Sequence, residues 1–289
     1  MIKFQQLLRQ VTPPLLVPLA RRLRDLLVAP EWRYIPEGWA YAERHPEVRG
    51  WNVAEVLAVY QAKWPRFVAL LQGSGPLGVA HESSLQSRSD LVAHNATMAF
   101  AYCLTLAARK RDRISMLDWG GGIGHYYLLA QALLPEVAIE YHSKDVALLS
   151  QYGAQLFPQQ QFSSDERCLQ QRYDFVLAST SIHYSEQWQE LIRRLAKATT
   201  GYLYIAHTPV VQQVPSFVFL QRPYSYGYQT EYLGWCINQG ELLAVAEEAG
   251  MRLLREFVYG QQPYIQAAPE QNSYRGYLFA PAHEDSHGA

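Results

Sequence analysis

The sequence predicts an α/β fold built on a mostly parallel sheet with helices on both faces. From residue 114 onward, short apolar runs alternate with segments of helix length, which is the pattern of successive β–α–β units. A glycine-rich turn joins the first of these runs, Ile114–Trp119, to the helix that follows. With 289 residues, 49% of them hydrophobic, the chain can bury a large core. One large α/β domain with an appended piece is therefore expected.

The first third of the chain is predicted to be mainly helical. Leucines interspersed with arginines give residues 1–28 a broken amphipathic pattern, which either packs on the domain itself or makes a peripheral membrane or partner contact. Helices are expected at Asn52–Leu71, ended by the glycines and proline of residues 73–76, and at Ser89–Ala108. We assign residues 1–85 to an N-terminal helical cap.

Residues 86–282 are assigned to the sheet domain, and the small polar tail 283–289 is expected to be loose. The predicted strands are 114–119, 137–143, 173–179, 202–206, 253–259 and 274–279, together with the short segment 161–164. The predicted helices are 124–134, 146–156, 186–198 and 240–249. Residues 209–238 connect a predicted strand to a predicted helix. This connection is unusually long and rich in aromatic residues, and loops of such length are usually functional.

Charge and cysteine usage exclude several classes of protein. There are 25 basic and 26 acidic side chains, so the net charge of −1 gives no reason to expect nucleic-acid binding. The three cysteines are far apart, which predicts neither a disulfide framework nor a metal site and favours a cytoplasmic protein. Prolines interrupt the N-terminal apolar residues and the long uncharged stretch 199–221, so neither a signal peptide nor a transmembrane segment is expected.

The glycine turn is the strongest functional signal. It reads Asp118-Trp-Gly120-Gly121-Gly122-Ile-Gly124 between a predicted strand and a predicted helix, where a ligand can approach the backbone and the free amides of the helix. The dinucleotide pattern GxGxxG fails, because its last position is occupied by His125 or Tyr127. The phosphate loop GxxxxGK fails as well, because no glycine in the chain precedes a lysine.

An acid followed by Gly120-x-Gly122-x-Gly124 resembles the first motif of class I S-adenosylmethionine (SAM) methyltransferases. That resemblance implies a Rossmann-like fold with a seven-stranded, mostly parallel sheet, and SAM as the cofactor. It also implies that the cofactor is bound by the residues of this turn, which are Asp118, Gly120, Gly121, Gly122 and Gly124.

Two further acids extend the predicted cofactor site. Asp145 ends the second predicted strand 21 residues after Gly124, where a carboxylate can accept hydrogen bonds from a ribose diol. Because Asp145 also begins a helix, an N-cap role is the alternative. Asp165 matches the acid that meets the adenine amino group in this family, although Glu166 stands beside it.

Several short segments, which occur in a particular order along the chain, indicate a narrower family. They resemble a largely uncharacterised family of bacterial methyltransferases found among surface-polysaccharide and related biosynthesis genes, and the match covers roughly residues 35–280. The segments are Gly75-Pro-Leu-Gly-Val-Ala-His-Glu82, His94-Asn95, His125-Tyr126-Tyr127, Ala178–Tyr184, Gln221-Arg222-Pro223-Tyr224 and Trp235–Asn238. One departure is His207, where an arginine is expected, so no anion-binding role is implied at that position.

Candidate catalytic and acceptor residues follow from strand order. Methyl transfer to oxygen usually needs a base, and His183 and His207 follow the strands whose carboxyl ends would face the methyl group. For both histidines the alternative is a structural role in the loop. The candidate acceptor-binding residues are His94, Asn95, Tyr184, Gln221 and Tyr224.

The function predicted from these observations is O-methylation of a sugar or another hydroxylated small molecule in glycan or related biosynthesis. A non-catalytic SAM-fold scaffold and a nucleotide-dependent oxidoreductase are the alternatives. The aromatic residues of 209–238 serve either the acceptor or a homodimer contact.

Overall fold

The computed structural model describes residues 30–78 and 90–282. Three predictions fall outside these residues: the possible membrane-contact segment 1–28, the second half (79–82) of the segment Gly75–Glu82, and the tail 283–289.

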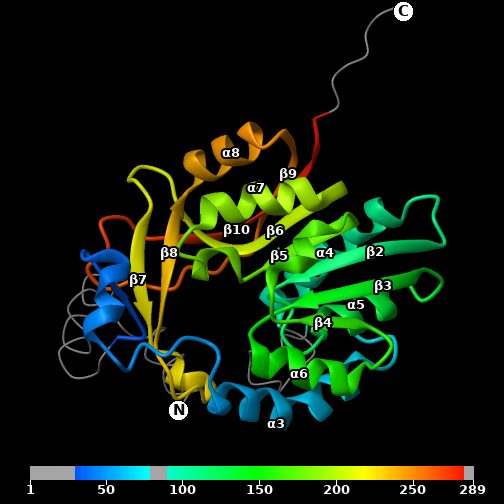
Figure 1. Ribbon diagram of the computed structural model, residues 1–289, viewed down its shortest axis with the longest axis horizontal. Coiled ribbons are helices and arrows are strands. Elements are labelled where there is room, and N and C mark those ends of the chain that lie inside the picture. The colour runs from blue at the N-terminus through cyan, green and yellow to red at the C-terminus, as the bar shows by residue number, and fades with distance from the viewer. Residues whose placement is uncertain (1–29, 79–89, 283–289) are drawn as a thin grey trace, which may run out of the picture.

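A ten-stranded sheet forms the centre of the molecule (Figure 1). Its parallel part has the order β6-β5-β2-β3-β4, and β10 pairs antiparallel with β6 while β9 pairs antiparallel with β10. The bounds of these strands are β2 Arg113–Trp119, β3 Ala138–Lys144, β4 Gln161–Ser163, β5 Tyr173–Ser179, β6 Thr199–Val211, β9 Met251–Val258 and β10 Ser273–Pro281. All the strands predicted from residue 114 onward are therefore present.

The prediction of seven mostly parallel strands was wrong, because three more strands extend the sheet. They are β1 (Trp32–Tyr34), β7 (Phe217–Gln221) and β8 (Tyr232–Asn238). β7 pairs antiparallel with both β1 and β8. The added strands attach because β6 continues beyond the end of β5, so that Val210 and Val211 pair with β8 on the edge that β5 no longer occupies. Half of the region predicted as an insertion, residues 209–238, is therefore regular sheet.

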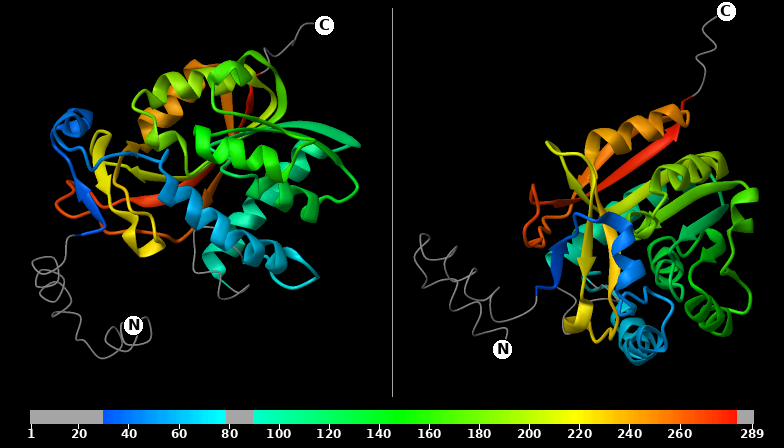
Figure 2. Two further views of the ribbon diagram at one scale, coloured as in Figure 1. Left: turned by 60° about the horizontal axis from the view of Figure 1, so that its bottom comes forward. Right: turned by 60° about the vertical axis from the view of Figure 1, so that its left-hand side comes forward.

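Two pairs of helices cover opposite faces of the sheet (Figures 1 and 2). α4 (Leu91–Ala108) and α5 (His125–Leu133) bury apolar side chains against Phe175 and Leu177 of β5. α7 (Trp188–Ala198) and α8 (Gln239–Glu248) bury theirs against Val176 and Ala178 of the same strand. Successive side chains of a strand point to opposite faces, which explains how one continuously apolar strand serves both helix layers.

α3 (Ala54–Leu71) and α6 (Ala147–Leu156) lie together near the end of the sheet where β2 and β3 finish (Figure 1). Tyr60 of α3, Ile123 of the glycine turn and Leu149 of α6 form one buried cluster. Of the predicted helical cap, α3 therefore packs on the turn, whereas the cap residues of β1 join the sheet through β7. Four 3₁₀ segments complete the fold: Gly38–Arg44, Glu166–Gln170, Ile182–Tyr184 and Pro223–Tyr226.

α4 is the one described helix with the length and hydropathy to cross a membrane, with a mean hydropathy of 1.3 over its 18 residues. Phe100, Cys103 and Leu104 on this helix are fully buried against the sheet. Core helices of globular domains have the same composition, so this observation is weak evidence for a membrane span.

Candidate functional site

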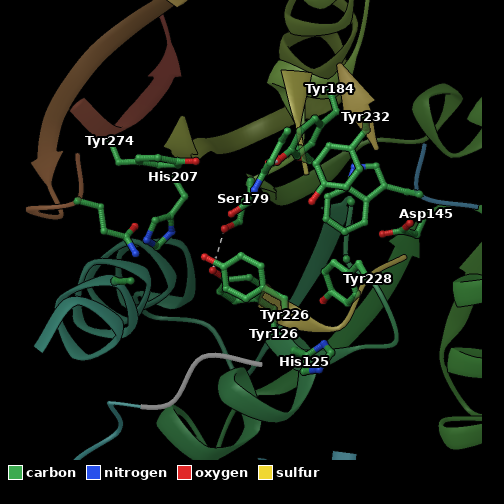
Figure 3. A pocket seen from close by; sticks show the side chains of 18 of the residues that line it. His125, Tyr126, Asp145, Ser179, Tyr184, His207, Tyr226, Tyr228, Tyr232 and Tyr274 are labelled. Atoms are coloured by element: carbon green, nitrogen blue, oxygen red, sulfur yellow. Dashed lines mark hydrogen bonds between the residues drawn. The ribbon is translucent and has the colours of Figure 1, made fainter. Parts of the chain in front are cut away.

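A cavity of about 870 Å³ opens where four parallel strands reach their carboxyl ends. The glycine turn after β2, Asp145 after β3, Ser179–Ser181 at the end of β5 and His207 on β6 all line it. Ligands of open α/β sheets bind at this edge. In Figure 3, Asp145 and His207 lie on opposite sides of the view, and the Ser179–Tyr126 hydrogen bond of 2.8 Å lies between them.

The glycine turn takes its shape from contacts that a side chain would prevent. Gly120, Gly122 and Gly124 have φ angles of +77°, +58° and +101°, which L side chains rarely adopt. A Cβ at Gly120 would lie 2.4 Å from the Cβ of Ser181, at the end of the neighbouring strand β5. Gly120 and Gly121 line the cavity directly, whereas Gly122 and Gly124 support the turn from outside it.

Asp118 lies beneath the turn and does not line the cavity. Its Oδ2 accepts a hydrogen bond of 2.6 Å from the Tyr141 hydroxyl, and a Cβ at Gly121 would lie 2.7 Å from this carboxylate. Burial, with a smaller contribution from the charge of Asp145, raises the pKa of Asp118 to about 7 against the opposing hydrogen bond from Tyr141. The structure thus gives Asp118 contacts that hold the turn in place.

Asp145 connects the turn to the cavity. Its Oδ2 accepts a hydrogen bond of 2.7 Å from the backbone amide of Gly122, and its Oδ1 accepts one of 2.6 Å from the amide of Val146. Burial raises its pKa, and the two amide hydrogen bonds oppose that shift. Each carboxylate oxygen keeps a further lone pair, so the group can still accept hydrogen bonds from a ligand in the cavity.

Asp165 lies outside the cavity, whereas its neighbour Glu166 lines it. The Asp165 carboxylate caps the 3₁₀ segment that follows and forms a two-pronged ion pair with Arg167, with oxygen–nitrogen distances of 3.0 and 2.7 Å. These contacts lower its pKa to about 2. Glu166 pairs with Arg194.

His207 combines access to the cavity with a strained backbone. Its φ of +48° is uncommon for a residue other than glycine, and its ring stacks on Tyr259 with centroids 4.0 Å apart. The ring makes no hydrogen bond to a described residue. Burial lowers its pKa to about 4, so the imidazole is neutral near pH 7. A neutral ring facing a cavity can accept a proton.

His183 differs from His207 in almost every respect. Its ring is fully buried, does not line the cavity and has no described hydrogen-bond partner on either nitrogen. Burial, with a smaller contribution from the charge of His207, lowers its pKa to about 3. The ring packs against Tyr184 with centroids 4.1 Å apart, which places His183 behind the cavity wall.

Three aromatic rings form a continuous part of the cavity wall, which we call the aromatic wall: Trp51, Tyr184 and Tyr232. Trp51 and Tyr232 are stacked at 4.4 Å, and Tyr184 meets each of them edge-on at 5.3 and 5.0 Å. Figure 3 shows Tyr184 and Tyr232 together at one side of the cavity. The Tyr184 hydroxyl donates to Oε1 of Gln221, so these two predicted acceptor residues meet in the cavity.

The other predicted acceptor residues lie elsewhere. His94 and Asn95 are on α4, but the cavity is lined by their neighbours Val92, Ala93, Ala96 and Thr97. Tyr224 is 48% exposed and donates its hydroxyl to Glu231, outside the cavity.

Several lining residues were not predicted from the sequence, among them Glu31, Trp51 and Tyr60. They come from the part of the chain predicted only as a helical cap. Helical periodicity could indicate that Tyr60 is buried, but no local pattern indicates that Glu31 faces residues near 221. Within 30–78 and 90–282, no cluster of His, Cys, Asp and Glu could hold a metal ion.

The fold is similar to several solved structures of low sequence identity. One is an S-adenosylmethionine-dependent methyltransferase from Clostridium acetobutylicum, with 10% identity over 65% of this chain and 91% of that chain and a TM-score of 0.44. Another is the magnesium protoporphyrin IX methyltransferase of Synechocystis, with 12% identity over 77% and 95% and a TM-score of 0.47. A third is human N-acetylserotonin methyltransferase, with 13% identity over 84% and 64% and a TM-score of 0.45.

No curated protein matches this chain. A family model described as a methyltransferase domain matches residues 92–254, which is more than half of the chain and includes the glycine turn, Asp145 and both candidate histidines. The chain therefore belongs to the methyltransferase domain family, and its cofactor is S-adenosylmethionine.

Proposed function

We propose that this SAM-dependent methyltransferase methylates a hydroxyl oxygen of a small molecule, with His207 as the general base. The acceptor class that we propose is a sugar or another hydroxylated compound of glycan or related biosynthesis. The observation that carries the proposal is the neutral, strained His207, whose ring faces the same cavity as the glycine turn.

The described residues fit the cofactor. A Cβ at Gly120 would collide with Ser181, and one at Gly121 would collide with Ser143 and Asp118. Both positions therefore require glycine, and their backbone without side chains forms the floor of the cavity. The lining carries the carboxylate of Asp145, which binds the turn, and that of Glu166, and such acids suit a positively charged ligand with ribose hydroxyls. Cavities for small molecules usually measure about 300–1,000 Å³, so about 870 Å³ can hold a cofactor together with an acceptor.

SAM supplies an activated methyl group for an in-line displacement, and the residues of the chain align the acceptor and exclude water. In the proposed reaction, a new carbon–oxygen bond forms as the carbon–sulfur bond breaks. A ring nitrogen of His207 takes the hydroxyl proton. Because burial lowers the pKa of His207, this base is already unprotonated near pH 7.

The aromatic wall and the Tyr184–Gln221 hydrogen bond support a hydroxylated acceptor. Flat aromatic faces pack against the apolar face of a ring, while the side-chain amide of Gln221 and the hydroxyls of Ser179 and Thr180 can exchange hydrogen bonds with its polar groups. The resemblance to surface-polysaccharide methyltransferases supports the same class.

The test is release of S-adenosylhomocysteine (SAH) from SAM in the presence of a panel of hydroxylated acceptors. For His207→Asn we expect kcat to fall by about 10²–10⁴-fold, the usual contribution of a general base, while SAM affinity stays within about twofold. Asparagine is the matched replacement, because it tolerates a positive φ but cannot act as the base.

Three outcomes would contradict parts of the proposal. Unchanged kcat in His207→Asn would remove His207 as the base. Products methylated only on nitrogen or carbon would remove the oxygen acceptor. SAM binding without turnover of any acceptor in the panel would favour a non-catalytic scaffold.

A further inference from the structure

Glu31 is a carboxylate in the cavity wall that forms no ion pair with any residue of 30–78 or 90–282. It precedes β1 and lines the cavity beside Trp32 and Gln221. Its oxygens accept only long hydrogen bonds from neutral donors: 3.3 Å from Trp32 Nε1, 3.4 Å from Gln221 Nε2 and 3.3 Å from Ser225 Oγ.

Arg222 contacts Glu31 through its backbone, but its guanidinium group binds other residues. The backbone amide of Arg222 donates to the Glu31 carbonyl, but its guanidinium forms a buried ion pair of 2.8 Å with Glu231 and also donates to the Pro30 carbonyl. No described Lys, Arg or His lies within ion-pair distance of the Glu31 carboxylate.

A carboxylate that is mostly removed from water is costly unless a cation or several strong hydrogen bonds compensate for the lost hydration. Burial accordingly raises the pKa of Glu31, and its three hydrogen bonds only partly oppose this shift. A ligand that brought a positive charge to this carboxylate would supply the missing partner.

The surroundings also favour a cation. The charged side chains that line the cavity are the four acids Glu31, Asp90, Asp145 and Glu166 and the single base Lys144, with no arginine among the described residues. Lys144 lies over the Trp119 ring at 4.3 Å, on the glycine-turn side. The side with Glu31 instead carries Trp32 and the aromatic wall, whose ring faces attract cations.

We propose that Glu31 binds a cationic amine of the acceptor, so that the acceptor is an amino-bearing hydroxyl compound without phosphate or carboxylate groups near this wall. The inference rests on the proposed function and narrows its substrate class. Glu31 acts as a specificity-determining residue that orients the acceptor through an ion pair, with the aromatic wall beside the amine.

The probes are benzylammonium and benzyl alcohol, which share a ring and differ in charge. Each is titrated near neutral pH into the full-length protein saturated with SAH, with binding followed by ligand-observed NMR. We expect saturable binding of benzylammonium at least about tenfold tighter than that of benzyl alcohol, because a charge-assisted hydrogen bond adds to the ring contact.

Glu31→Gln keeps the size and hydrogen-bonding capacity of the side chain and removes its charge. In this variant the affinities for benzylammonium and benzyl alcohol should agree within about twofold. The matched control is Glu37→Gln, an exposed glutamate six residues away, which should keep the wild-type preference. The thermal unfolding transition of each variant reports that the protein is folded, and its affinity for SAH reports the state of the cofactor site.

Several results would overturn the inference. These are equal affinity of the wild type for the two probes, no saturable binding of benzylammonium, or a preference that survives in Glu31→Gln. A tenfold loss of SAH affinity in Glu31→Gln would instead place Glu31 in the cofactor site. Failure of the wild type to bind SAH would contradict the methyltransferase function itself, a result distinct from loss of the amine preference alone.

Discussion

His207 and Thr180 show how the site is built at the scale of single residues. Only four non-glycine residues in the described chain have a positive φ, and these two line the cavity, His207 at +48° on β6 and Thr180 at +51° directly after the neighbouring strand β5. Such conformations cost free energy and persist where the surrounding structure enforces them, often at functional sites. The strain therefore points to the same part of the cavity as the neutral imidazole.

Sequence alone could not separate the two candidate histidines. His183 and His207 both follow a predicted strand, and both are next to small or hydroxylated residues. His183 is buried behind Tyr184, whereas the backbone at His207 turns its ring into the cavity. Both features depend on packing between strands that are distant in the sequence.

The fall of kcat/KM at low pH should reflect protonation of His207. The base must be neutral, so kcat/KM should stay level through pH 6.5 and fall only as the pH approaches the lowered pKa of about 4. The groups facing this ring are Tyr259, Tyr274 and His183, and neither tyrosine titrates in this range. Initial rates measured from pH 4 upward provide the test. An acid limb centred near the ordinary histidine value of about 6.5 would contradict it.

At the scale of elements, the sequence predicted the parallel core better than its extension. Strands β2, β3 and β5 stand between helices of clear period, so their apolar runs are unambiguous. β7 and β8 are equally apolar, but they lie in a stretch with four tyrosines, prolines and glycine, which favoured a loop. β1 has three residues and is held by pairing with β7, about 185 residues later in the chain, and by a bridge to Gln266, and no local pattern can indicate either contact.

The close approach of the glycine turn to β5 can be tested with a matched pair of variants. Gly120 and Gly250 have the same φ of +77°, but a Cβ at Gly120 would lie 2.4 Å from Ser181 while one at Gly250 has no neighbour within 4 Å. Both alanine variants should lose about 1–2 kcal/mol of stability from the left-handed backbone.

Only Gly120→Ala should also lose cofactor affinity, by at least about a hundredfold or about 2.7 kcal/mol, because the turn must move. Calorimetric titration with SAM measures this loss. Equal affinities in the two variants would show that the turn does not form the cofactor floor.

At the scale of the whole molecule, His183 and His207, whose pKa values are lowered to about 3 and about 4, link stability to pH. A histidine whose pKa is lowered on folding stabilises the folded state above the unfolded pKa of about 6.5, and this stability is lost as the pH falls. With a folded pKa of about 3, His183 accounts for a loss of about 2 kcal/mol between pH 7.5 and pH 5. Asp118, whose pKa is raised to about 7, changes stability in the opposite direction over the same range.

The contribution of His183 is therefore isolated by comparison with His183→Leu. Urea unfolding of both proteins at the two pH values should show that the variant loses about 2 kcal/mol less on acidification. Its kcat should stay within a few-fold of the wild type, because this ring does not line the cavity. Equal pH dependence in the two proteins would mean that His183 is not held neutral in the folded state.

The cavity, the glycine turn and Asp145 together make cofactor binding the central claim, and calorimetric titration of the purified chain tests it most directly. SAM and SAH should bind in the micromolar range, NAD should not bind, and Asp145→Ala should lose SAM binding. A folded chain that binds neither SAM nor SAH, or that binds NAD instead, would contradict this claim.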